Sequence, residues 1–126
     1  MTDPLELQRF PARLGCALHG LGILILGSAN ARIHLLATML VVGLGLWLRL
    51  GLSEWLWIVG AIGMVWTAEA FNSALEVLAD RVSAERDPLI GRAKDLAAGA
   101  VLAAAIVAAS IGLLIFVPAF IALTGH

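Results

Sequence analysis

The sequence is poor in charge and rich in apolar residues. Only 13% of its 126 residues are Asp, Glu, Lys or Arg, whereas about 25% is usual in a soluble domain, and 61% are hydrophobic. The mean hydropathy is +0.98. These values exclude a soluble globular enzyme, and the length leaves room for a single domain.

The sequence also lacks the residues that several common kinds of functional site require. The one cysteine, Cys16, can form neither an internal disulfide nor a cysteine-based zinc cluster, and the three histidines do not have the spacing of metal ligands. The net charge of −1 creates no field that would attract nucleic acid. The phosphate-binding motifs of soluble kinases, G-x-x-x-x-G-K-[ST] and G-x-G-x-x-G, do not occur. A nucleotide site in this chain must therefore be built in another way.

Three long apolar segments indicate an all-α integral membrane protein that forms one domain over residues 1–126. Residues 33–51, 54–80 and 92–122 are each long enough for a helix that crosses the ~30 Å hydrocarbon core. We expect Ser53 to cap the second of these helices. Proline cannot continue a regular helix, so Pro118 should kink or end the third.

The N-terminal segment is harder to assign. Residues 5–31 predict a helix at the membrane interface, but residues 14–31 carry no Asp, Glu, Lys or Arg, so a weak fourth span is the alternative. Three of the eight basic residues precede the first predicted span and four lie between positions 81 and 94, near the connection of the second and third spans; only Arg49 lies on the other side. Because basic residues collect on the cytoplasmic side, we expect the N-terminus and the 80–95 loop to be cytoplasmic.

Polar residues form a stripe along the second predicted span. Ten of the 17 charged residues lie between positions 69 and 95, and Glu69, Asn72, Glu76 and Asp80 share one helix face at spacings of three, seven and eleven residues. Glu69 lies about 24 Å along the helix axis, inside the core, where an ionisable residue marks a pathway, a proton relay or a reaction. A desolvated carboxylate there suits general-base work on a lipid hydroxyl, while Glu76 can hold a cation at the water boundary.

Other interpretations of these charges remain open from the residues alone. Lys94 and Asp95 stand at the expected start of the third span, where backbone amides and a lysine can bind phosphate; an interfacial anchor is the alternative. A noncatalytic membrane scaffold would tolerate loss of Glu69 and Lys94 together. A small proton-coupled transporter would use Glu69 as its carrier, but it would need little of the charge clustered on the cytoplasmic side.

One run of residues is highly specific. The sequence Glu69-Ala-Phe-Asn72-Ser73-Ala74-Leu-Glu76, followed by Ala93-Lys94-Asp95, resembles the prokaryotic diacylglycerol kinase and undecaprenol kinase family, and the resemblance extends from about Phe10 to Phe120. It implies a homotrimer of three-span subunits in the bacterial inner membrane, each with a preceding interfacial helix, and active sites shared between neighbouring subunits. It also implies transfer of the γ-phosphate of ATP, with Mg²⁺, to a lipid alcohol, either undecaprenol or diacylglycerol.

The resemblance also implies roles for individual residues. By position, Glu69 is the general base, Asn72 its polar partner and Glu76 a metal ligand. Ser28 stands where the family carries a second metal-binding glutamate, which leaves three interpretations: a kinase with fewer protein ligands to its metal, a member with a changed donor or acceptor, or a relative without catalysis. The residues implied to lie around the nucleotide are Arg9, Glu76, Asp80, Gly91, Lys94 and Asp95.

Overall fold

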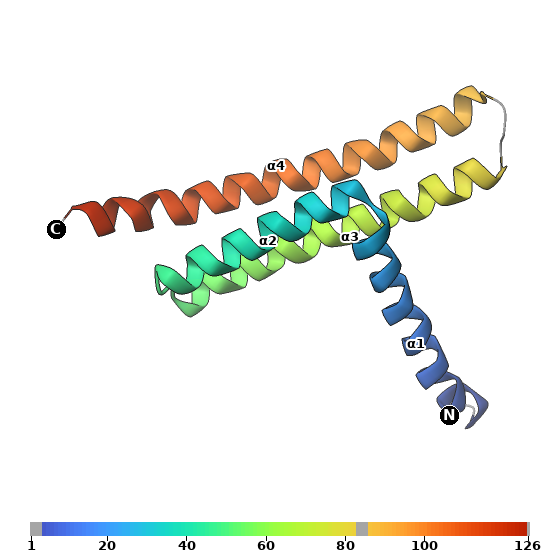
Figure 1. The fold of residues 1–126 in the computed structure, drawn as a ribbon, viewed down its shortest axis with the longest axis horizontal. Coiled ribbons are helices and arrows are strands. Elements are labelled where there is room, and N and C mark those ends of the chain that lie inside the picture. The colour runs from blue at the N-terminus through green and yellow to red at the C-terminus, as the bar shows by residue number, and fades with distance from the viewer. Residues whose placement is uncertain (1–3, 83–85, 126) are drawn as a thin grey trace.

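The computed structural model describes residues 4–82 and 86–125, which form four helices (Figure 1). By length and composition each helix could cross a membrane, α1 doing so from Arg9 onward. The all-α prediction is therefore confirmed, and the interfacial position of the first helix stays a prediction. The helices in chain order are α1 (Pro4–Gly27), α2 (Ala29–Trp47), α3 (Leu52–Val82) and α4 (Pro88–Thr124).

The break between α1 and α2 lies at Ser28, three residues before the end of the expected interfacial helix at position 31. Ser28 has an extended backbone, with φ −117° and ψ 132°, and its Oγ accepts a hydrogen bond from the Ala31 amide at 3.3 Å. A serine in this conformation caps the helix that follows it. The predicted boundary was wrong because a serine that caps a helix within an apolar run does not change the hydropathy of the segment.

The turn between α2 and α3 is tight. Arg49 adopts a left-handed conformation, with φ 55°, and the Leu50 amide donates to the carbonyl of Gly45 at 3.1 Å, which closes the end of α2. Gly45 is required here because a Cβ atom at this position would lie 2.8 Å from the Trp55 ring. The indole of Trp55 therefore packs directly on the backbone of α2.

The start of α3 differs from the prediction that Ser53 is its cap. The helix begins at Leu52, and the Glu54 carboxylate accepts a hydrogen bond from the Gly51 amide at 2.8 Å. The Trp55 amide donates to the Gly51 carbonyl at 3.1 Å, so Gly51 takes the cap position. A glutamate that reaches back to the cap amide satisfies one of the free donors of the first turn.

Helix α4 is longer at both ends than the predicted span 92–122. Asp87 caps it, since its Oδ1 accepts a hydrogen bond from the Leu89 amide at 2.8 Å, and Pro88 follows as the first helical residue. The helix also continues through Pro118 to Thr124, so this proline does not end it, and the alternative, a kink at Pro118, stays a prediction. Proline removes a single backbone hydrogen bond, which a long helix can lose and still continue.

Helix α3 is the centre of the arrangement, because α1, α2 and α4 all pack against it. In Figure 1, α4 runs antiparallel to α3 along most of its length, and α1 points away from the other three helices. Within the described residues, α1 does not pack against α4. The start of α2, the end of α3 and the start of α4 lie towards one end of the molecule, opposite the turn that carries Arg49.

Very little of the apolar surface is buried inside one chain. Most of the large hydrophobic side chains are exposed, as expected where lipid or other subunits cover the helices. Only two polar side chains are buried among the described residues, and both belong to the predicted stripe on α3: Glu69 and Asn72. The buried apolar residues are Leu24, Ala31, Ile58, Ala61, Ala79 and Ala104.

Candidate active site

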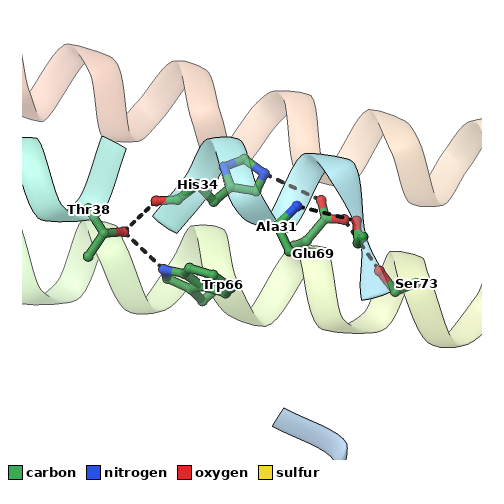
Figure 2. Close-up of polar contacts among 7 residues, drawn as sticks. Ala31, His34, Thr38, Trp66, Glu69 and Ser73 are labelled. Atoms are coloured by element: carbon green, nitrogen blue, oxygen red, sulfur yellow. Dashed lines mark hydrogen bonds and ion pairs between the residues drawn. The ribbon is translucent and has the colours of Figure 1, made fainter. Parts of the chain in front are cut away.

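The candidate site begins at the buried part of the polar stripe on α3. Glu69 is 1% exposed and Asn72 is 5% exposed, and Figure 2 shows the Glu69 carboxylate directed towards α2. Their separation of three residues places them on the same helix face. Glu69 is therefore buried within the helix bundle, and its predicted depth in the membrane core stays a prediction.

Two side chains approach the Glu69 carboxylate from different helices. The Ser73 hydroxyl, one turn further along α3, donates to Oε1 at 3.3 Å. His34 of α2 brings Nε2 to 3.4 Å from Oε2, close enough for an ion pair but without the geometry of a hydrogen bond. Among the described residues, Oε2 and the Asn72 Oδ1 atom thus accept no hydrogen bond. Buried oxygens that lack donors are costly, and at a functional site they are available to a ligand.

His34 is itself held by its surroundings. The Thr38 hydroxyl donates to the His34 carbonyl at 2.7 Å, and the indole Nε1 of Trp66 donates to the Thr38 hydroxyl at 3.0 Å (Figure 2). The rings of His34 and Trp66 meet edge to face, with centroids 6.2 Å apart. His34, Thr38 and Trp66 are not among the site residues predicted from the sequence. The sequence feature that could have indicated these residues is that they are polar side chains at helical spacing within predicted membrane spans.

A cavity of about 430 Å³ lies where α1, α2 and α3 meet, next to the shallower part of the stripe. Glu76 and Asp80 line it from α3, together with Ser73, and Ser28 and Asn30 line it from the start of α2. Ser73 therefore both contacts Glu69 and borders this cavity. The oxygens that α3 contributes to the cavity lie on the same helix face as the buried carboxylate.

The cavity suits a cation only if another molecule supplies ligands. Among the residues that the structure describes, no cluster of three His, Cys, Asp or Glu side chains could hold a metal ion. Mg²⁺ is commonly held by one or two carboxylates together with the phosphate groups of a substrate and water. Glu76 with the neutral oxygens of Ser28 and Ser73 fits that arrangement.

Lys94 does not lie at the beginning of a helix as the sequence predicted, and its contact with phosphate stays a prediction. Helix α4 begins at Pro88, and the Gly91 amide already donates to the Asp87 carbonyl at 2.9 Å. The expected start was too late because the charged residues Arg92, Lys94 and Asp95, which follow the apolar first turn of α4, lower the hydropathy of this segment. Lys94 instead binds Asp80 of α3, with Nζ 3.2 Å from Oδ1. Both side chains are substantially exposed, so this ion pair adds little stability but keeps the lysine near the cavity.

The structure brings only part of the expected nucleotide set together. Glu76, Asp80 and Lys94 lie close to one another at the cavity and at the α3–α4 contact. Gly91 and Asp95 are exposed on α4, and Arg9 is exposed on α1. Since α1 does not pack against α4 within the described part of the chain, Arg9 does not join Lys94 in a single subunit.

A second, apolar cavity of about 280 Å³ lies between α2, α3 and α4. Its polar lining residues are His34, Thr38 and Trp66, and the others are apolar, among them Ile58 and Phe116. His34 therefore faces Glu69 and also borders an apolar space. Taken together, the buried carboxylate lies between a polar cavity and an apolar cavity.

Comparison with known proteins agrees with this arrangement. The family model described as prokaryotic diacylglycerol kinase matches residues 15–116. Undecaprenol kinase of Bacillus subtilis (strain 168) is 35% identical over 113 residues, which make up 90% of this chain and 92% of that protein. Diacylglycerol kinase of Escherichia coli (strain K12) is 34% identical over 94 residues, or 75% of this chain and 77% of that protein.

The family match covers most of the chain and includes the whole polar stripe of α3. Both of these relatives are named as kinases, which supports neither the noncatalytic scaffold nor the proton-coupled transporter considered from the sequence. The chain belongs to the prokaryotic diacylglycerol kinase family and is a membrane lipid kinase.

Proposed function

We propose that this protein transfers the γ-phosphate of ATP to the hydroxyl group of undecaprenol or diacylglycerol at the cytoplasmic face of the bacterial inner membrane. The observation that carries the proposal is the Glu69 carboxylate, which is buried between helices and keeps Oε2 free of hydrogen bonds within the described residues. Glu76 lies about two turns further along the same face, at the polar cavity. A lipid hydroxyl and a nucleotide phosphate can therefore meet along one helix.

In the proposed reaction, Glu69 acts on the acceptor. Its carboxylate takes the proton of the lipid hydroxyl, the hydroxyl oxygen bonds to the γ-phosphorus, and the bond from phosphorus to the β–γ bridging oxygen breaks to release ADP. Asn72 lies one turn away with its carbonyl oxygen unpaired, so its amide can orient the acceptor. The apolar cavity beside His34 takes part of the lipid chain, which places the hydroxyl near the carboxylate.

The polar cavity would hold the nucleotide. Glu76 would bind Mg²⁺ together with phosphate oxygens, and this cation supplies neutralisation of the charge on the β- and γ-oxygens. Lys94, held beside the cavity by Asp80, would contact a phosphate, and we assign Asp80, Gly91 and Asp95 to its surroundings. Ser28 contributes at most a neutral oxygen at the position from which it lines the cavity.

The proposed site also needs residues from a neighbouring subunit, and we expect a homotrimer. Most large apolar side chains are exposed in one chain, and Arg9 on α1 is not brought to the α4 residues of the same chain. Arg9 would reach the nucleotide of an adjacent subunit. Crosslinking and mass measurement in mild detergent should therefore show trimers, and a protein that remains monomeric at all concentrations would contradict this expectation.

The activity itself is the first test. The purified protein, incubated in mixed micelles with ATP, Mg²⁺ and either undecaprenol or diacylglycerol, should produce a phosphorylated lipid and ADP in equal amounts. The Glu69→Gln variant serves as the control, because it keeps the shape of the side chain but removes the base. Failure of the wild-type protein to phosphorylate either lipid would refute the proposal, and a comparison of the two rates identifies the acceptor.

The roles of the two carboxylates predict different kinetic defects. Removing a positioned base costs about 10²–10⁴-fold in rate, so Glu69→Gln should lower kcat by that factor while nucleotide binding is preserved. Glu76→Gln should lower the rate and also raise the Mg²⁺ concentration required for half-maximal activity. Rates measured at varied ATP and Mg²⁺ concentrations distinguish the two defects. Equal, small losses of rate in both variants would mean that the polar stripe is structural.

Ser28 predicts an unusual dependence on Mg²⁺. A serine leaves more of the cation's coordination shell to water than a carboxylate would, so activity should require a high Mg²⁺ concentration. Ser28→Glu should lower that requirement and raise the rate, because position 28 lines the same cavity as Glu76. The matched control is Ser28→Ala, which loses the helix cap at a cost of about 1 kcal/mol but adds no ligand. If Ser28→Glu and Ser28→Ala respond alike to Mg²⁺, position 28 does not contribute to the metal site.

A further inference from the structure

His34 occupies a position that the proposed mechanism has not used. Its Nε2 lies 3.4 Å from Oε2 of Glu69, and its side chain is 18% exposed whereas that of Glu69 is 1% exposed. Ser73, the other side chain in contact with this carboxylate, belongs to the same helix as Glu69. His34 is thus the contact that ties the carboxylate to a second helix, and the orientation of the carboxylate depends on how α2 packs on α3.

The imidazole is restrained by the indole ring of Trp66, which is in turn held by Thr38. Thr38 bonds to the His34 carbonyl and to the indole of Trp66, and the indole ring meets the imidazole edge to face. These contacts link one turn of α2 to one turn of α3 around His34. A ring restrained in this way can hold a neighbouring carboxylate in one orientation at little further entropic cost.

Other charged groups do not compete for this contact among the described residues. The residues of α4 that border the cavity beside His34 are apolar, among them Ala105, Ala108 and Phe116. On α3, the next acidic residue, Glu76, lines the polar cavity and is exposed. On α2, Arg32 is exposed. The interaction between the imidazole and the carboxylate is therefore local and little screened by water.

We propose that His34 is a positioning residue for Glu69: its Nε2–H group holds Oε2 in the orientation that receives the proton of the lipid hydroxyl. The inference rests on the proposed function, in which Glu69 is the base. In this structure the contact is long and not aligned as a hydrogen bond, so the oxygen keeps a free lone pair. Contacts of this kind tighten when the substrate is bound. The side chain of His34 acts through Glu69 and does not itself react.

Two amide substitutions separate this role from a general packing role. The amide nitrogen of glutamine lies close to where histidine carries Nε2, whereas that of asparagine lies close to the position of Nδ1, and both donate hydrogen bonds. His34→Asn should lower kcat by about 100-fold, the cost of a misplacement of about 1 Å, with KM for ATP unchanged. His34→Gln should recover most of that loss. The matched control is His19→Gln, an exposed histidine on α1, which should keep the wild-type rate.

The contact can also be tested without turnover, so that a failure of the proposed function does not leave this inference untested. In protein carrying ¹⁵N-labelled histidine, Glu69→Gln should shift the imidazole resonances of His34 and leave those of His19 unchanged. An unshifted His34 resonance would overturn the inference whether or not the protein phosphorylates lipids. In the active protein, equal rates for the glutamine and asparagine variants, or a loss confined to KM for ATP, would overturn it and leave the assignment of Glu69 as the base intact.

Discussion

The burial of one carboxylate between apolar helices is the constraint on which the rest of this structure depends. An ionisable group inside a bilayer costs a few kcal/mol on insertion scales and is retained where it has a pathway, a relay or a reaction to serve. Glu69 is accommodated by a hydroxyl from its own helix and an imidazole from α2. Ala31, three residues before His34 on α2, is fully buried and has a very small side chain. Helix α2 must therefore pack on α3 at this level and with this face.

The position of the helix break follows the same geometry. The chain breaks at Ser28, between α1 and the part of α2 that packs near Glu69. Helix α1 points away from the other three helices (Figure 1). The space between the three helices becomes the polar cavity that Glu76 and Asp80 line. On the other side, α2 and α4 flank α3 with an apolar cavity between them. The stripe on α3 thus lies between a polar cavity and an apolar cavity, which we propose hold the nucleotide and part of the lipid chain.

The parts of the site that lie on one helix were predictable, and those that join helices were not. The spacing of Glu69, Asn72 and Glu76 determines their common face, because helical periodicity alone sets it. The contact of His34 with Glu69 joins residues of two helices and depends on the turn at Arg49 and on the close approach of Trp55 to Gly45. The starts of α2 and α4 were misplaced because Ser28 and Asp87 act through hydrogen bonds that the hydropathy of a segment does not record. Lys94 was expected among free helix-start amides, and only the coordinates showed that it binds Asp80.

By itself, the sequence determined that this protein is all-helical and suited to a membrane, that its charges gather at one end, and that a polar face runs along one helix. These properties are local or additive: hydropathy sums along a segment, and a helix places every third or fourth residue on one face. The tertiary structure decided which oxygens are buried without a donor, which helix supplies the partner of Glu69, and where the two cavities lie. Those features depend on the packing of separate helices, which is set by the shapes and hydrogen bonds of side chains far apart in the chain.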